Sequence, residues 1–115
     1  MFNVTLEIKQ NTTFEKNFVW KTGELQSPVD LTGCTAVGQA RESQSSETVA
    51  ITFISPSSIV LGGTTGSIKL KLTPIETLAI PEGNYVYDIL IVFPDGTKKP
   101  LIEGIIKVES SVTKV

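Results

Sequence analysis

Two carboxylates, Asp88 and Glu103, are the residues whose type and spacing could support chemistry. Each lies inside a hydrophobic run, and the two runs flank the turn at 94–96, so a hairpin would place both carboxylates on neighbouring strands. Paired carboxylic acids roughly 5–10 Å apart hydrolyse glycosides, but only inside a cleft that holds the sugar. Nothing nearby supplies an aromatic platform for a sugar at the rim of such a cleft. We therefore interpret both as structural strand positions, and we predict that the protein is not an enzyme.

Arg41 offers a more specific interpretation of the two carboxylates. It is the only arginine beside nine lysines, and it stands at the end of a predicted strand. A planar guanidinium binds a partly buried carboxylate through two parallel hydrogen bonds, which an ammonium group cannot do. We hypothesise that Arg41 forms an ion pair with Asp88 or Glu103 across the sheet. All three residues would then have a structural role.

The other candidates for chemistry are weaker. Histidine is absent from the sequence, so Cys34, the single cysteine, lacks a base, and no histidine-based catalytic or metal site can be built. The segment GGTTG at 62–66 lacks the lysine of a phosphate-binding loop and precedes a strand pattern, so we predict a hairpin turn. The acidic residues that could bind calcium are too dispersed for a dedicated site: Glu24, Asp30 and Asp95. We predict no catalytic residue, no metal, no cofactor and no small-molecule substrate.

Length and charge narrow the class of protein. A chain of 115 residues fits one domain, predicted to span residues 1–115. Ten basic and twelve acidic residues are spread without blocks, which argues against binding to nucleic acid or to an anionic membrane surface. The N-terminal segment lacks the pattern of a secretory signal, and no apolar run approaches the roughly 20 residues of a membrane span. These features predict a protein that is kept in the cytosol or assembled into a particle there.

Short alternating segments predict strands along most of the chain. Residues 2–8 alternate apolar and polar side chains, as a strand with one buried face does, and we expect 14–20 to pair with this first strand. Residues 85–93 are apolar at nearly every position, which predicts a central strand covered on both faces. Further strands are predicted at 35–42, 49–54, 58–61, 67–72 and 101–108, with a loop at 21–33 that inserts Leu31 into the core.

One segment predicts a helix. Thr73, Pro74 and Glu76 form a capping-box pattern with proline at the first helical position, and the helix is expected to end near Ala79. Seven to nine short strands with one short helical turn near 74–79 predict an all-β fold, an antiparallel immunoglobulin-like β-sandwich.

Two tyrosines follow this helical turn with a spacing that such sandwiches use. Tyr85 stands near the start of a strand, where a tyrosine corner directs its hydroxyl to a nearby backbone group. Tyr87 stands where an immunoglobulin domain has its second core cysteine. We interpret both tyrosines as structural residues.

The order of several short motifs resembles that of small tailed-bacteriophage virion proteins. The motifs are DLTG at 30–33, GQAR at 38–41, GSIKLKLT at 66–73, EGNYVYDI at 82–89, DGT at 95–97, LIEG at 101–104 and VTK at 112–114. The same order is found in the N-terminal domain of phage upper baseplate proteins and in small tail, neck and head-surface proteins. The chain is similar to this group over most of its length.

This resemblance implies a structural virion protein that acts through protein–protein contacts in the assembly of a tail, baseplate, neck or capsid surface. Its expected partners are other virion proteins and copies of itself, bound through edge strands, the loops at 21–33 and 43–48, and the two chain ends. The expected location is the virion, after synthesis in the host cytoplasm. The alternative is a host-receptor or carbohydrate-binding module of a phage particle, although most of the eight aromatic residues fall at core-facing positions.

Overall fold

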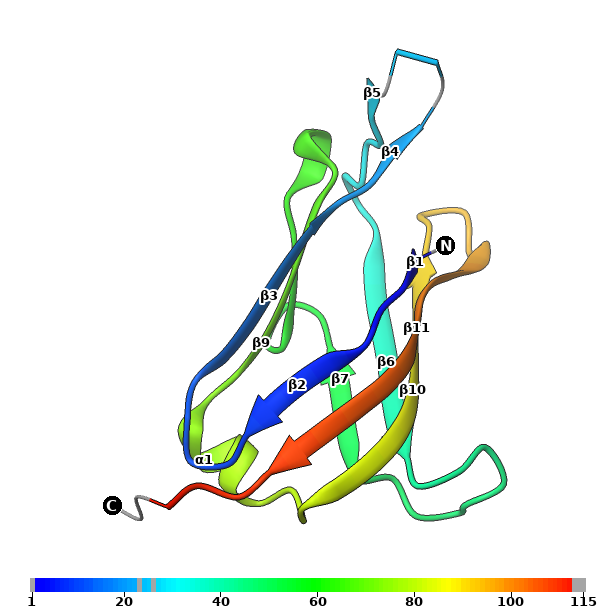
Figure 1. The fold of residues 1–115 in the computed structure, drawn as a ribbon. Coiled ribbons are helices and arrows are strands. Elements are labelled where there is room, and N and C mark those ends of the chain that lie inside the picture. The colour runs from blue at the N-terminus through cyan, green and yellow to red at the C-terminus, as the bar shows by residue number, and fades with distance from the viewer. Residues whose placement is uncertain (1, 23, 26, 113–115) are drawn as a thin grey trace.

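Two β-sheets pack face to face around a shared hydrophobic core (Figure 1). The computed structural model describes residues 2–22, 24–25 and 27–112. Its elements are β1 (Phe2–Asn3), β2 (Leu6–Lys9), β3 (Phe14–Val19), β4 (Lys21–Thr22), β5 (Ser27–Pro28), β6 (Thr35–Arg41), β7 (Ile51–Ile54), β8 (Ile59–Leu61), the 3-10 helix η1 (Gly63–Thr65), β9 (Ser67–Leu72), α1 (Pro74–Leu78), β10 (Gly83–Val92) and β11 (Lys98–Glu109). The larger sheet has the order β1-β11-β10-β6-β7, with β2 also paired to β11. The smaller sheet has the order β3-β9-β8, and β4 and β5 form a separate two-stranded ribbon.

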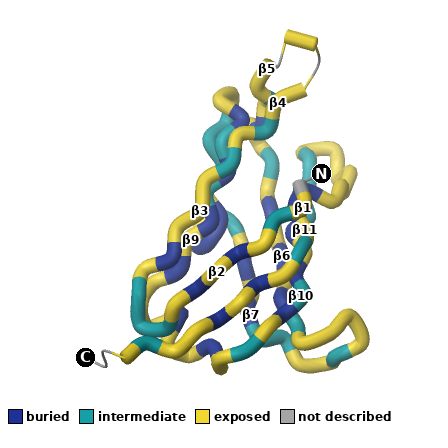
Figure 2. Tube along the Cα trace, in the orientation of Figure 1, coloured by how far each residue is buried: buried dark blue, intermediate teal, exposed yellow. Residues whose placement is uncertain are grey.

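The core lies between the two sheets and is built by alternation along the strands. In β6 and β7, for example, every second side chain is buried (Figure 2), because successive side chains of a strand point to opposite faces. The largest fully buried side chains come from both sheets and from one loop: Leu6, Ile8, Leu31, Phe53, Ile59, Ile68, Leu70, Ile89, Ile91, Leu101, Ile102 and Ile106. The predicted immunoglobulin-like β-sandwich is confirmed, and it has more strands than predicted because several are only two to four residues long.

The first predicted strand is divided in two and pairs differently from the prediction. β1 and β2 both pair in parallel with β11, with Phe2 opposite Ile102 and Leu6 opposite Ile106. The prediction that 14–20 pairs with this first strand is wrong, because β3 pairs with β9 in the other sheet. The larger sheet is therefore mixed and not purely antiparallel. The chain crosses between the sheets in the short turn from β2 to β3, where a hairpin was expected.

A buried threonine holds this crossing turn in place. The Thr77 side chain in α1 is fully buried, and its hydroxyl donates to the Thr12 carbonyl at 2.8 Å. The Thr12 amide donates back to Thr77 Oγ1 at 3.2 Å. The Gln10 side chain adds a bond from Nε2 to the Ile80 carbonyl at 2.6 Å. These bonds join the turn to the far end of α1, and they satisfy polar groups that the sandwich would otherwise bury without partners.

Strand β10 is central, as predicted, but only one of its faces is covered. It lies between β6 and β11. Its side chains alternate between buried and partly or fully exposed positions. Val86, Leu90 and Val92, which point away from the core, are half-buried. The prediction of a strand covered on both faces is therefore wrong for the described residues, although the sequence of β10 has the apolar character of such a strand.

The helix prediction is confirmed in detail. The Thr73 hydroxyl accepts from the Glu76 amide, the Glu76 carboxylate accepts from the Thr73 amide, and Pro74 opens α1. Leu31 is buried as predicted, and the loop before it contains the β4–β5 ribbon, which projects beyond the sandwich (Figure 1). The predicted turn at 62–66 contains η1 and ends at Gly66 in the left-handed conformation.

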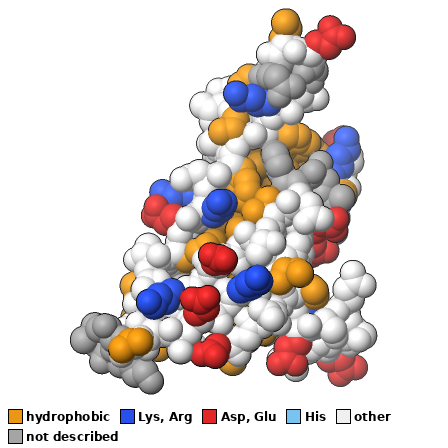
Figure 3. Space-filling view, in the orientation of Figure 1, with side chains coloured by type: hydrophobic (Ala, Val, Ile, Leu, Met, Phe, Trp, Pro, Cys, Tyr) orange, Lys and Arg blue, Asp and Glu red, His pale blue; other side chains and the backbone are white. Residues whose placement is uncertain are grey.

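Strands β2 and β3 belong to different sheets and diverge from each other above the crossing turn. Hydrophobic surface is visible between them (Figure 3).

Candidate functional site

The most distinctive surface is the outer face, which we define as the face of the larger sheet turned away from the smaller sheet. The strand register places four apolar side chains in one row across it. Ile54 of β7 lies opposite Val37 of β6, Val37 opposite Leu90 of β10, and Leu90 opposite Pro100 of β11. Ile54 is 50% exposed and Val37 37% exposed. Directly opposite side chains touch within a sheet, so these four residues, hereafter the apolar row, form a continuous strip.

Polar and charged side chains flank the apolar row on both sides. In one direction along the strands, the register brings together Thr52, Gln39, Asp88 and Glu103. The first three lie two residues from the apolar row, whereas Glu103 lies three residues from Pro100, because the β10–β11 pairing contains a register shift. Two residues in the other direction, it brings together Thr35, Val92 and Lys98. The outer face therefore has an acidic pair, Asp88 and Glu103, on one side of the apolar row and Lys98 on the other. The next row beyond the acidic pair contains Arg41, Val86 and Ile105.

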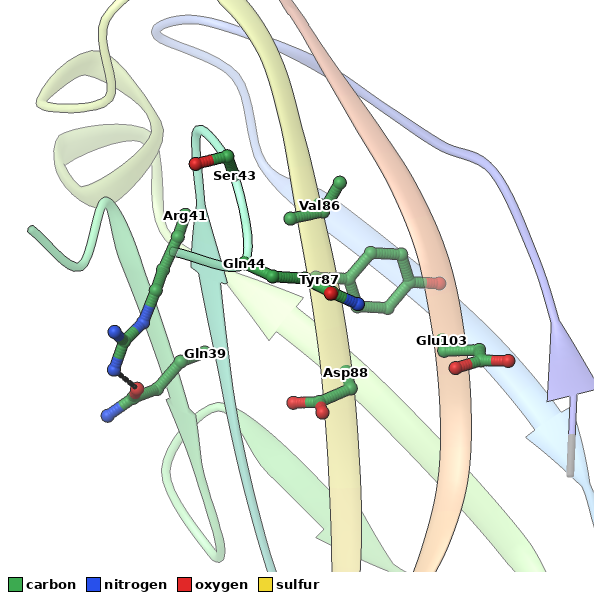
Figure 4. Close-up of a pocket in the computed structure, with 8 residues that line it drawn as sticks. All are labelled: Gln39, Arg41, Ser43, Gln44, Val86, Tyr87, Asp88 and Glu103. Carbon is green, nitrogen blue, oxygen red and sulfur yellow. Dashed lines mark hydrogen bonds between the residues drawn. The ribbon is translucent and has the colours of Figure 1, made fainter. Parts of the chain in front are cut away.

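Asp88 and Glu103 lie side by side, as the predicted hairpin requires. They are direct partners in the β10–β11 register, and both side chains are exposed. They line part of a shallow hollow of about 350 Å³ on the outer face (Figure 4). Like charges directly opposite one another in a sheet repel. The hollow lies on an open sheet face, so the two carboxylates are not enclosed with a substrate as acid–base hydrolysis requires.

The predicted partners of Arg41 are wrong. Its Nη2 donates to Gln39 Oε1 at 2.7 Å, and its Nη1 donates to the Ser46 carbonyl at 2.8 Å. Figure 4 shows the guanidinium turned toward Gln39 and away from Asp88. Among the described residues, the one ion pair joins Lys69 Nζ and Glu15 Oε1 at 3.5 Å. The register explains the difference: Arg41 lies opposite Val86 at the end of β6, so the guanidinium reaches the 43–48 loop.

Each of the two tyrosines donates a hydrogen bond from its hydroxyl to a backbone carbonyl. The Tyr85 hydroxyl donates to the Pro81 carbonyl at 2.6 Å, which is the bond of a tyrosine corner. The Tyr87 hydroxyl donates to the Val4 carbonyl at 2.8 Å, in the break between β1 and β2. Both side chains are buried. Burial raises the pKa of Tyr85, with a smaller contribution from the charge of Glu42, and burial raises the pKa of Tyr87 to about 12.

The raised pKa of Tyr87 predicts a loss of stability in alkali. An unfolded tyrosine ionises near pH 10, whereas folded Tyr87 holds its proton until about pH 12. The folded state therefore binds more protons between these values, so the stabilisation is complete below pH 10 and is lost as the pH rises toward 12. We expect the free energy of unfolding, measured with urea, to fall by roughly 2–3 kcal/mol across this window from Tyr87 alone. Tyr87→Phe should be less stable at pH 8 and should show a shallower alkaline decline; an equal decline would assign the effect to other groups.

The remaining candidates carry no chemistry that the geometry supports. Cys34 is half-buried, and burial, assisted by the charge of Asp30, raises the pKa of its thiol, which disfavours the nucleophilic thiolate. Asp30 and Asp95 accept turn hydrogen bonds from the Thr32 and Thr97 amides at 2.9 and 2.8 Å. Within the described ranges, no three acidic or cysteine side chains gather as metal ligands would, and no helix is long and apolar enough to cross a membrane.

The sequence reasoning missed the outer face as a surface. The sequence does contain apolar residues at outward positions that could have indicated this surface. In β10, Val86, Leu90 and Val92 alternate with core residues. Val37 in β6 and Ile54 in β7 also point outward. Recognising it required knowing that β7, β6, β10 and β11 are neighbours in that order, which fixes the four side chains in one row.

No family model matches the chain, and no curated protein matches it. Solved structures that match include the extracellular domain of the voltage-gated sodium channel beta4 subunit, described as a parallel homodimer with a role in cell–cell adhesion. It is 11% identical, with 96% of this chain and 93% of that chain covered and a TM-score of 0.45. A second match comes from work on the multimeric cell-adhesive interactions of sodium channel beta subunits, at 14% identity, the same coverage and a TM-score of 0.40.

The prediction of a phage virion protein is wrong. No family model and no curated protein links the chain to a phage, and the two structures described above come from sodium channel beta subunits and not from a phage. The predicted virion partners, the virion location and the alternative of a phage receptor- or carbohydrate-binding module are corrected with it. Three of the seven motifs are explained by sandwich chemistry: 30–33 and 95–97 are turns, and 82–89 is the tyrosine corner with its strand. Part of the last motif, 113–114, lies outside the described residues.

Proposed function

We propose that this chain is one non-enzymatic domain, spanning residues 1–115, that acts through protein–protein contacts and assembles with copies of itself. The observation that carries the proposal is the apolar row on the outer face. Single exposed apolar residues are common on soluble proteins, but contiguous apolar surface rimmed by polar groups marks an interaction site. The row meets this description, because its four side chains are in register and polar or charged residues stand on both sides.

The composition of β10 supports the same proposal. Strands that are apolar on both faces are normally covered on both faces. The smaller sheet covers one face of β10, and Val86, Leu90 and Val92 on the other remain half-buried. A partner that packs on the outer face would complete their burial.

A second copy of the chain is the partner that the charges favour. The outer face carries an acidic pair on one side of the apolar row and Lys98 on the other, so another copy offers complementary charges to both. Asp88 and Glu103 then serve recognition and not catalysis, which agrees with their position on an open face.

Sedimentation velocity over a wide concentration range tests this proposal. We expect the mass to rise from the 12.4 kDa of the single chain toward twice that value as concentration increases. High salt should weaken the association, because screening reduces attraction between exposed charges. A mass of 12.4 kDa at every concentration that the protein tolerates would contradict self-assembly.

A further inference from the structure

We infer that two copies pack outer face to outer face about a two-fold axis that runs along the apolar row. The inference rests on the self-assembly proposed above and adds the surface, the symmetry and one specific charge pair. In this arrangement each copy places Ile54, Val37, Leu90 and Pro100 against the same four residues of its partner. A two-fold interface uses the same patch on both subunits, so each residue on the axis meets the same residue of the other copy. Apolar side chains can pack against identical side chains, whereas charged side chains would repel each other.

The axis also brings opposite charges together. Glu103 and Lys98 lie on the same strand, β11, on opposite sides of Pro100. Glu103 pairs with Asp88, and Lys98 pairs with Val92. Asp88 and Val92 each lie two residues from Leu90, on opposite sides of the apolar row. A half-turn about the apolar row exchanges the two sides. Glu103 of one copy therefore faces Lys98 of the other, and the symmetry forms this pair twice.

Both members of the pair are available for it. Glu103 and Lys98 are exposed, and the ion pair found among the described residues involves neither of them. The neighbouring Lys99 is engaged differently, since its Nζ lies 5.7 Å from the centre of the Phe93 ring. Glu103 has Asp88 directly opposite it, so a lysine from a partner would add a positive charge beside an acidic pair.

Another position of the axis is disfavoured by the same charges. An axis along the row of Asp88 and Glu103 would place each carboxylate against the same carboxylate of the other copy. Like charges juxtaposed in an interface repel each other, and no apolar strip would lie at the centre to offset this repulsion. The apolar row carries no charge, so the two-fold axis can lie along it without setting like charges against each other.

The dimensions of the face set the expected strength. With 33 residues in β6, β7, β10 and β11, strand rise and spacing give a flat area of roughly 500 Å² per copy. Protruding side chains increase the buried area above this flat value. It still remains below the roughly 800 Å² per partner that a standard interface buries. A reversible dimer is therefore expected, with two sandwiches stacked through their larger sheets.

Charge reversal at the two positions tests the geometry. Glu103→Lys alone would set two lysines against each other in both pairs, and Lys98→Glu alone would set two glutamates against each other. We expect each variant to self-associate roughly tenfold or more weakly than the natural chain, because two exposed pairs change from attraction to repulsion. Mixing the two variants should restore association as a heterodimer, since both pairs are then complementary again. Native mass spectrometry with one variant isotopically labelled distinguishes the heterodimer.

A second pair of variants tests the apolar row. Val37→Lys places a charge on the proposed axis and should abolish dimerisation, whereas Ile75→Lys changes an equally apolar side chain that is 83% exposed on α1, away from the outer face. Both positions are exposed, so circular dichroism should show both variants folded. If the natural chain dimerises but none of these changes affects it, the geometry is overturned while self-assembly stands. If the natural chain stays monomeric, both proposals fail.

Discussion

Gly104→Ala is expected to lower the free energy of unfolding by about 3 kcal/mol or more, one of the largest effects of any single methyl group in this protein. Gly104 lies in β11 with φ 153°, a conformation that residues with a side chain rarely adopt. A Cβ there would collide with the backbone of Val4, at the break between β1 and β2. The Tyr87 hydroxyl bonds to the Val4 carbonyl at the same point, so a shift of Val4 would also weaken that bond.

Gly96→Ala is the matched control for this substitution. Gly96 also has a positive φ, 91°, but a Cβ there would meet nothing within 4 Å. It should cost only the roughly 1–2 kcal/mol of the backbone conformation. Urea unfolding of both variants separates the two contributions. Equal losses at the two positions would show that the close approach of Val4 to β11 contributes nothing.

Phe53→Ala is expected to cost about 3–5 kcal/mol, because it empties a large space in a packed core. Phe53 is the largest of the fully buried side chains, and it lies on the edge strand β7. Its backbone partner is Gly38 in β6, where β10 approaches so closely that a Cβ would come within 2.5 Å of the Asp88 carbonyl. A neighbourhood this tight has little freedom to collapse into the cavity.

The next residue along β7 provides the contrast. Ile54 points to the outer face and is half exposed, so Ile54→Ala should change the stability of the single chain by less than about 1 kcal/mol. It should instead weaken self-association, because Ile54 belongs to the apolar row. Thermal unfolding at low concentration, together with sedimentation, measures both properties. A large loss of single-chain stability in Ile54→Ala would mean that the outer face is already packed within the chain.

The local features of the fold could be predicted because their causes are local. Thr73 and Glu76 lie three residues apart, and their reciprocal bonds follow from that spacing. Tyr85 reaches Pro81 four residues earlier. Strand positions followed from the alternation of side chains, which a single sequence displays directly.

Partners distant in the sequence were not predictable in the same way. The alternation in residues 2–8 predicts a strand with one buried face, but it does not specify which strand lies beside it. The true partner, β11, is about a hundred residues away and runs in parallel. Arg41 was assigned to a carboxylate on charge alone, whereas the register sends its guanidinium to Gln39 and the Ser46 carbonyl.

The candidate site required the topology as well. Asp88 and Glu103 were correctly expected on neighbouring strands, because a hairpin joins them. The apolar row crosses four strands whose order in space, β7-β6-β10-β11, differs from their order in the chain. Turn and corner motifs shared by many sandwiches suggested a family, but such motifs report the chemistry of the fold and not the use to which it is put.

The parallel pairing of β1 and β2 with β11 also determines how the protein would carry mechanical load. The chain enters at the start of β1 and leaves at the end of β11, at opposite ends of the same ladder (Figure 1). A pull on the two ends would draw these strands past each other along their length. The bonds between 6–9 and 106–109 would then resist together in shear, and they would not open one at a time as in a pulled hairpin. Tension would therefore be borne by the joined terminal strands, leaving the outer face of the sheet free for contact.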